Sequence, residues 1–411
     1  MTDASQRVAV IGAGPAGLMA AEMLAQNGFG VDVYEAMPSP ARKFLMAGKS
    51  GLNITHTSAP APFEKTYPGA SKSLVTALQA FGPDETLQWM EGLGIGTHIG
   101  PTGRAFPVHM KASPLLRAWL ERLQTDGVKL HTRHKWMGWE ADGAHQFQIS
   151  GGVVKATAAA TVFALGGGSW RRLGSTGEWR TQFETAGIDT SPFRASNCGF
   201  TVDWSDKIKS QYAGHPVKNV KVTVAGPEEI SSREEFVLTE RGVESGAIFS
   251  LSSLLRDQLE QHAAATLSLD LAPDISKEQL TDRLRGGRGK QSFANYLRKA
   301  ANLKGVKRGL LFELGNRSCF ENPEALAALI KTLPLQVTGT APLDEAISTA
   351  GGVSWNALND QFMIRQRSGV FCAGEMIDWD APTGGFLLTA CLATGRAAGL
   401  SAAQWLKTRP R

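Results

Sequence analysis

The stretch that decides the fold is RVAVIGAGPAGLMAAEMLAQNG at residues 7–28, followed by VDVYE at residues 31–35. RVAVI is a short apolar run typical of a buried strand, GAGPAG is a glycine turn, and LMAAEMLAQNG has helical character and ends at Gly28. VDVYE predicts a second strand. This order of strand, turn, helix and strand predicts a βαβ unit and the α/β fold class.

The glycine turn has the spacing of a dinucleotide-binding fingerprint. Gly12 permits the tight turn, Gly14 lets backbone N–H groups approach a pyrophosphate, and Gly17 allows the helix to pack closely on the strand. Glu35, which ends the second strand, is placed to accept hydrogen bonds from ribose hydroxyls. We therefore expect a three-layer, FAD/NAD(P)-binding, Rossmann-like domain rather than a turn that only joins a strand to a helix. The residues expected to contact the dinucleotide here are Gly12, Gly14, Pro15, Ala16, Gly17, Glu35 and Ala36.

The composition limits the remaining possibilities. The chain has 411 residues, 42% of them hydrophobic, which is enough for two or three domains with a buried core. Its net charge of +5 is spread along the chain and does not imply nucleic acid. The four cysteines form neither a C-x-x-C pair nor a zinc-ligand cluster, so we expect no metal site and a reducing, cytoplasmic setting. No uninterrupted run of 18 apolar residues predicts a membrane span.

The texture of the sequence changes twice along the chain. From about residue 195 it reads as mixed strands, followed by a basic, helical stretch at about 275–332. At about residue 340 the glycine-rich texture returns, and the chain ends in a helix of small residues. We predict a dinucleotide-binding domain built from residues 1–194 and 341–411, with an inserted substrate or cap domain of mixed β and helical structure at 195–340.

The first fingerprint does not decide between FAD and NAD as the cofactor. A set of further motifs favours FAD. In chain order they are AGKSGLNITH at 47–56, ALGGGSW at 164–170, GSTGE at 174–178, TAGGV at 349–353 and AGEMIDWDAPTGGF at 373–386. With GAGPAG and Glu35, these motifs resemble the FAD-dependent flavoproteins known as bile-acid Δ(4,6)-reductase-like or aminoacetone-oxidase-like. The resemblance spans essentially the whole chain.

The resemblance implies FAD as the cofactor and assigns further residues to it. Glu375, preceded by Gly374, would accept a hydrogen bond from a ribityl hydroxyl, and the N-terminus of the last helix would face N1 and the C2 carbonyl of the flavin. Arg42 and Lys43 would hold phosphate or adenosine groups, and the backbone of Trp136 would pair with adenine. The remaining residues implied to contact FAD are Ser50, Gly51, Asn53, Gly166, Gly384, Gly385 and Phe386.

The chain departs from the family pattern at two places near the flavin. Many members carry Gly-Arg-Cys-Asn where this chain has Ser50-Gly51-Leu52-Asn53, so cysteine chemistry is excluded there. Phe386 stands where tyrosine is commoner. The identity of the substrate is therefore not carried over from the family.

The reaction expected from the sequence is hydride transfer between FAD and a small or medium organic substrate. We expect the substrate to be an unsaturated carbonyl compound in preference to an amine. Only one dinucleotide fingerprint is present, so electrons would come from a bound substrate or from transient NAD(P)H. The alternatives are a tRNA-modifying flavoenzyme, suggested by the basic stretch at 283–308, and a non-catalytic flavin-binding protein. His56, His109, Arg104 and Trp379 lie in or beside motif loops, but none is assigned a catalytic role, and the oligomeric state stays open.

Overall fold

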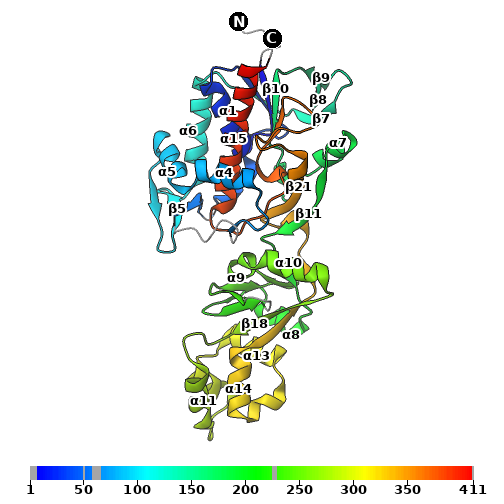
Figure 1. Ribbon diagram of the computed structural model, residues 1–411. Coiled ribbons are helices and arrows are strands. Elements are labelled where there is room, and N and C mark those ends of the chain that lie inside the picture. Colours follow the sequence, from blue (N-terminus) through cyan, green and yellow to red (C-terminus); the bar gives the residue numbers. More distant parts are fainter. Residues whose placement is uncertain (1–6, 50, 58–65, 225–228, 410–411) are drawn as a thin grey trace. The chain divides into compact units, whose positions relative to one another are not determined.

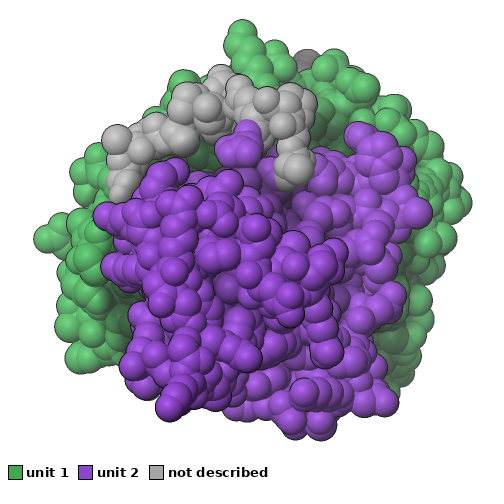
Figure 2. Space-filling model, turned by 90° about the horizontal axis from the view of Figure 1, so that it is seen from below, with its two compact units in different colours: residues 1–194, 347–411 green, residues 195–346 purple. Residues whose placement is uncertain are grey.

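The computed structural model describes residues 7–49, 51–57, 66–224 and 229–409. The chain forms two compact units, one of residues 1–194 with 347–411 and one of residues 195–346 (Figure 2). The chain returns to the first unit at residue 347 rather than at 341. The reason is that β20 (Gly339–Thr340) pairs with β12 (Phe200–Thr201) and so still belongs to the second unit.

The first unit is built on a five-stranded sheet in the order β22-β10-β1-β2-β6, and every neighbouring pair is parallel. The strands therefore end at one edge, where parallel sheets bind their ligands. The predicted α/β, Rossmann-like fold class is confirmed. The strands are β1 (Val8–Ile11), β2 (Val31–Glu35), β6 (Lys129–Thr132), β10 (Ala160–Phe163) and β22 (Val370–Cys372).

Two helices, α1 (Pro15–Gln26) and α15 (Phe386–Thr408), run side by side in this unit (Figure 1). They approach closely because glycines line the contact: a Cβ at Gly395 would overlap the carbonyl oxygen of Ala16, and one at Gly399 would lie 2.7 Å from the carbonyl oxygen of Ala20. By length and composition α15 could span a membrane. Its packing along α1 makes it a core helix of this unit.

A three-stranded antiparallel sheet, β7-β8-β9, packs aromatic side chains against β10 and α7 (Trp179–Thr185). Trp136 and Trp139 lie 4.8 and 5.3 Å from Phe163, measured between ring centroids. This sheet is the third layer of the unit. Its strands are β7 (Lys135–Trp139), β8 (His145–Ile149) and β9 (Gly152–Ala156).

His145 lies within this aromatic layer and is 3% exposed. Its Nδ1 accepts a hydrogen bond of 3.2 Å from Trp136 Nε1, which leaves the ring proton on Nε2, 2.7 Å from Thr161 Oγ1. Burial, with a smaller contribution from the charge of Arg367, lowers the pKa of His145 to about 4. The folded protein therefore holds this imidazole neutral.

This lowered pKa predicts an acid-sensitive first unit. Between pH 6.5 and 4 the unfolded chain binds a proton that the folded His145 does not, so stability present above pH 6.5 is lost as the pH falls. We expect the melting temperature to drop by roughly 5 °C or more between pH 7 and 4.5. A His145→Gln variant should lose most of this pH dependence, while His109→Gln, at an exposed histidine, should retain it. Equal pH dependence in all three proteins would contradict the assignment.

The other elements of the first unit surround its sheet edge and its helices. They include the antiparallel sheet β3-β5-β4 and the strand pair β11–β21. Their bounds are α2 (Arg42–Ala47), β3 (Thr55–His56), α4 (Lys72–Ala80), α5 (Pro83–Gly92), β4 (Thr97–Ile99), β5 (Arg104–Pro107), α6 (Ala112–Thr125), β11 (Thr190–Ser196) and β21 (Ser348–Val353).

The second unit combines two sheets, β13-β16-β17-β12-β20 and β15-β14-β18-β19, with helices, as expected for a mixed β and helical insertion. Its own core is formed by buried aliphatic residues of both sheets and of the helices. The remaining strands are β13 (Pro216–Val217), β14 (Lys221–Val224), β15 (Ile230–Ser232), β16 (Phe236–Leu238), β17 (Gly242–Glu244), β18 (Ala265–Asp270) and β19 (Leu333–Val337). The helices are α8 (Asp206–Tyr212), α9 (Gly246–Ser250), α10 (Ser252–Gln261), α11 (Lys277–Arg285), α12 (Phe293–Ala301), α13 (Gly305–Leu314) and α14 (Pro323–Lys331).

Candidate cofactor site

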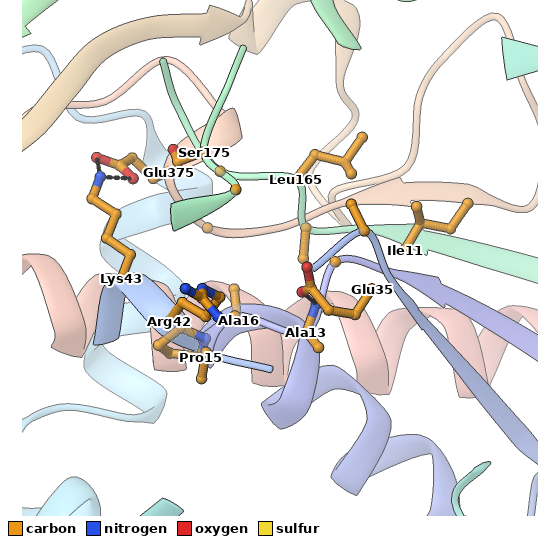
Figure 3. Close-up of a pocket in the computed structure, with 18 of the residues that line it drawn as sticks. Ile11, Ala13, Pro15, Ala16, Glu35, Arg42, Lys43, Leu165, Ser175 and Glu375 are labelled. Atoms are coloured by element: carbon orange, nitrogen blue, oxygen red, sulfur yellow. Dashed lines mark hydrogen bonds and ion pairs between the residues drawn. The ribbon is translucent and has the colours of Figure 1, made fainter. Parts of the chain in front are cut away.

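A pocket follows the edge where the parallel strands of the first unit end (Figure 3). It passes from the end of β2 over the glycine turn after β1, past the segment after β10, to the segment after β22. Of the residues predicted from the sequence to bind the cofactor, those lining the pocket are Gly12, Gly14, Pro15, Ala16, Glu35, Ala36, Arg42, Lys43, Trp136, Gly166, Gly374 and Glu375.

The three fingerprint glycines have different surroundings. Gly12 has φ 105°, and a Cβ there would overlap the carbonyl oxygen of Ala164 at the end of β10. A Cβ at Gly17 would overlap the carbonyl oxygen of Gly12, so the helix packs directly on the turn. At Gly14, the N-cap of α1, no atom lies within 4 Å of a Cβ. Gly14 therefore leaves free space in the pocket wall, in front of the uncapped helix N-terminus.

Glu35 connects the end of β2 to the glycine turn. Its Oε2 accepts from the backbone N–H of Ala13 at 3.0 Å, and its Oε1 accepts from that of Met37 at 2.8 Å. Burial raises the pKa of Glu35, while these backbone hydrogen bonds oppose the shift. Each carboxylate oxygen still has a second lone pair, which can accept a hydroxyl hydrogen from a ribose.

Arg42 and Lys43 begin the short helix α2 and reach to different parts of the pocket (Figure 3). Arg42 lies beside Pro15 and Ala16, at the N-terminus of α1, and its buried Nε has no partner among the described residues. Lys43 Nζ donates to both oxygens of Glu375, at 3.0 and 2.8 Å, and to Ser169 Oγ at 2.9 Å. The structure thus places Lys43 at the Glu375 end, far along the pocket from Glu35.

Glu375 is held by hydrogen bonds from two other segments of the chain, α2 and β21. Besides Lys43, the backbone N–H of Thr349 donates to its Oε1 at 3.0 Å, and Thr349 Oγ1 accepts from the N–H of Gly168 at 3.0 Å. Gly374 has φ 77° and packs against Ala16. The glycine-rich segments after β10, in β21 and after β22 therefore converge on one carboxylate.

Sequence reasoning missed several lining residues. Ser175 donates to the carbonyl oxygen of Gly167 at 3.0 Å and, with Gly174, belongs to the GSTGE motif, which was a usable signal. Cys391 lines the pocket from α15, and burial raises the pKa of its thiol to about 12, so it is no nucleophile. Trp136 lines the pocket with a side chain that is also part of the core. The other lining residues without a sequence prediction are Ile11, Ala13, Tyr34, Ala41, Phe44, His134, Ala164, Leu165, Leu173 and Ala373.

The remaining predicted residues, including Gly17 in the first turn of α1, lie outside this pocket lining. Ser50 is outside the described residues. Gly51 and Asn53 precede β3, and the buried Oδ1 of Asn53 has no partner in the described part of the chain. Gly384, with φ 123°, and Gly385, with φ 98°, lead into α15, whose first residue is Phe386.

Four candidate residues were left without a role, and only two of them lie side by side in the structure. Trp379 is buried and donates from Nε1 to the carbonyl oxygen of Gly374 at 2.9 Å. His109 is exposed. His56 and Arg104 face each other in the ladder between β3 and β5. Only the last two lie together.

The site fits an extended dinucleotide. One carboxylate stands at each end, Glu35 after β2 and Glu375 after β22. Between them, Gly14 leaves open space before a helix N-terminus, which favours a phosphate group. The unpartnered Arg42 Nε supplies a donor on the same stretch. No cluster of His, Cys, Asp and Glu suited to a metal ion occurs within the described ranges.

The comparison with protein families agrees with this geometry. Residues 6–401 match the model described as the HI0933-like protein Rossmann domain. The chain belongs to the HI0933-like family. The match includes the inserted unit, so the family is defined by both units and not by the nucleotide-binding half alone.

Curated relatives cover nearly all of the chain. The ribosomal RNA dihydrouridine synthase of Escherichia coli is 26% identical over 92% of this chain and 93% of its own length. The 3-dehydro-bile acid delta(4,6)-reductase of Clostridium scindens is 24% identical over 97% of this chain and 99% of its own. The second relative confirms the resemblance drawn from the motifs.

A solved structure shows the same fold. The 3-ketosteroid delta1-dehydrogenase of Sterolibacterium denitrificans superposes with a TM-score of 0.53 over 98% of this chain and 99% of that chain, at 11% identity. At this identity, the likeness concerns the arrangement of the chain.

Proposed function

We propose that this protein binds FAD and catalyses the reduction of a carbon–carbon double bond conjugated to a carbonyl group. The observation that supports FAD most directly is the single pocket that joins Glu35, the open glycine turn and Glu375 along one sheet edge. A bound flavin supplies the hydride in such a reduction. The chain supplies binding, orientation and a proton.

The names of the two relatives support the choice of reaction. A delta(4,6)-reductase of a 3-dehydro bile acid and a dihydrouridine synthase both add two hydrogens to a double bond beside a carbonyl. Their substrates otherwise differ in size and polarity. The shared feature is the conjugated double bond, so we assign that group, and a small or medium molecule carrying it, to this protein. Transient NAD(P)H is the proposed electron donor.

The proposed roles follow from position in the pocket. Glu35 would accept from the ribose, and the N-terminus of α1 with Arg42 would hold the pyrophosphate. Glu375 would accept from the ribityl chain while Lys43 fixes its orientation. The uncapped N-terminus of α15 would stabilise negative charge on the ring system. The four free cysteines suit the proposed cytoplasmic setting.

The experiment combines a spectrum with two half-reactions. Purified protein should be yellow, release FAD on denaturation and bleach anaerobically with NADH or NADPH. The reduced protein should then be reoxidised by 2-cyclohexenone or by a 3-keto-4-ene steroid, but not by the saturated ketones. Reoxidation by oxygen alone would contradict the proposal, and reduction by an amine in place of a nicotinamide would favour an amine oxidase.

Removing the charge of Glu375 should weaken FAD binding. Glu375→Gln loses a charged acceptor and leaves Lys43 unpaired, so we expect the Kd for FAD to rise about 10- to 100-fold, as for the loss of a hydrogen bond to a charged group. Titration of the apoprotein with FAD, followed by flavin fluorescence, measures this. Glu178→Gln, at an exposed ion-paired glutamate, is the control and should leave Kd unchanged. An unchanged Kd in Glu375→Gln would exclude Glu375 from the site.

A uracil base in RNA is a second candidate substrate, favoured by the charge of the second unit. Residues 283–317 hold ten Lys and Arg against one Glu. Phe312, which is 36% exposed, packs there with Phe293 and Phe320 and offers an aromatic surface. Seven of the cations are exposed and have no ion-pair partner among the described residues: Arg283, Arg288, Lys290, Arg298, Lys299, Lys304 and Arg317.

Salt dependence tests this candidate directly. A uridine-rich single-stranded RNA should bind with a steep salt slope, and the double variant Arg298→Gln/Lys299→Gln should reduce that slope by about 1.4, for two lost phosphate contacts. Lys207→Gln/Lys209→Gln, at exposed lysines of α8 in the same unit, is the matched control. If all three proteins bind the RNA weakly and with the same salt slope, RNA is not the substrate. The proposed reduction of a small molecule would then stand.

A further inference from the structure

The order of the strands gives the direction in which a dinucleotide must run. Glu35 follows β2, the glycine turn follows β1, Gly166 follows β10 and Glu375 follows β22, and these strands are consecutive neighbours in the sheet. A cofactor whose adenosine lies at Glu35 therefore passes β1 and β10 before it reaches Glu375. Its second half points toward the residues after β22, which lead to the N-terminus of α15.

Strand β3 is fixed on that N-terminus. A Cβ at Gly385 would lie 2.6 Å from the backbone of Thr55, so only glycine allows this approach. Thr55 Oγ1 also shares a hydrogen bond of 2.8 Å with Thr389 Oγ1, one turn into α15. Both contacts are buried, and they hold the next residue of β3, His56, at the start of the helix.

The imidazole of His56 stacks on the ring of Phe386. The ring centroids lie 5.1 Å apart, and the angle between the ring planes is 17°. A Cβ at Gly384 would lie 3.7 Å from His56 Cδ2, so the ring also lies against the glycine pair. Phe386 is held in turn, because the Tyr67 hydroxyl donates to its carbonyl oxygen at 3.0 Å. His56 is partly exposed. It is thus an ordered, partly exposed imidazole at the end of the site where the ring system is expected.

Arg104 and Tyr67 are titratable side chains beside this stacked pair. Arg104 on β5 faces His56 across the ladder. Burial, and after it the charge of Arg104, lowers the pKa of His56 below 6.5. Burial raises the pKa of Tyr67 far above its usual range, so this phenol is a poor proton source. The imidazole is the group of the pair that can exchange a proton near neutral pH.

We infer that His56 donates the proton that completes the reduction of the conjugated double bond; this rests on the proposed function. The hydride for the β-carbon of the substrate, with its two electrons, would be supplied by reduced FAD held between Glu35 and Glu375. The α-carbon accepts a proton from the imidazolium, whose N–H bond breaks as the new C–H bond forms. Water then returns a proton to the imidazole, and atoms and charge balance.

The first test separates the two half-reactions in FAD-loaded protein. In His56→Asn, bleaching by NAD(P)H should keep its wild-type rate, whereas reoxidation by 2-cyclohexenone should slow by at least about 100-fold, the lower end for loss of a general acid. In the wild type, reoxidation should slow as the pH rises above the pKa of His56, and this dependence should vanish in the variant. His98→Asn is the matched control, since His98 stacks on Phe106 at 5.5 Å in the neighbouring strands.

The second test does not depend on turnover. In NMR spectra of the protein with labelled histidine, addition of FAD should shift the ring signals of His56 and leave those of His98 in place. The inference would be overturned if His56→Asn is reoxidised at the wild-type rate. It would also be overturned if the ring signals of His56 do not shift when FAD is added. If wild-type protein reduces no conjugated substrate, the proposed function fails and the proton donation fails with it, while the NMR shift still reports whether His56 meets the cofactor.

Discussion

A Gly14→Asp variant should fold like the wild type and purify without FAD. No atom lies within 4 Å of a Cβ at Gly14, and its φ of −79° suits any residue, so the fold can accept the side chain. The carboxylate would, however, lie in the proposed pyrophosphate site. Two unit charges about 4 Å apart repel by about 4 kcal/mol at an effective dielectric constant of 20, which is roughly a thousandfold in Kd.

The matched control is Gly14→Asn, which adds nearly the same volume without the charge. We expect it to keep measurable FAD, with an affinity between those of the wild type and Gly14→Asp. The ratio of flavin absorbance to protein absorbance, the Kd for added FAD and the melting temperature of the apoproteins separate binding from folding. A yellow, fully loaded Gly14→Asp protein with an unchanged Kd would show that the pyrophosphate does not lie at this turn.

A Gly395→Val variant should lose most of the stability of the first unit. The first carbon of the new side chain would already overlap the carbonyl oxygen of Ala16, and backbone cannot rotate away as a side chain can. Helices α1 and α15 would have to separate. Overpacking of this kind costs about 3 to 5 kcal/mol, at the upper end for single substitutions.

Denaturant unfolding followed by circular dichroism measures this loss. Gln404→Val places the same β-branched side chain on an exposed position of α15 and should cost only a few tenths of a kcal/mol. FAD retention should fall in Gly395→Val together with stability, because Ala16 and Gly374 line the pocket next to this helix contact. Equal stability of the two variants would mean that the helices can move apart without cost.

Local patterns in the sequence were sufficient to predict one half of the site. The apolar run before Gly12, the glycine spacing and Glu35 are all set within the first 35 residues, and the structure has the strand, turn, helix and strand in that order. The inserted unit was also visible, since strand and helix periodicities differ between segments. These features depend on neighbours in sequence, which is why they can be read without a structure.

The contacts that cross the chain were not visible in this way. Lys43 pairs with Glu375, more than 300 residues later, whereas the family resemblance implied only that it holds phosphate or adenosine groups. Cys391 gave no signal because its place in the pocket depends on how α15 packs. The return to the first unit was placed at 341 instead of 347, because a two-residue strand such as β20 has no periodicity to detect. Such positions are decided by tertiary packing.

The two-segment construction of the first unit has a consequence during synthesis. Strand β22 and helix α15 are translated after the whole of residues 195–346. At synthesis rates of about 5 to 20 residues per second, the ribosome needs on the order of 10 s to make that insertion. Until then the open edge of β10 and the face of α1 that carries Ala16 and Ala20 have no partner. FAD can therefore be captured only at the end of translation, and the nascent chain presents an apolar surface on which chaperones can act.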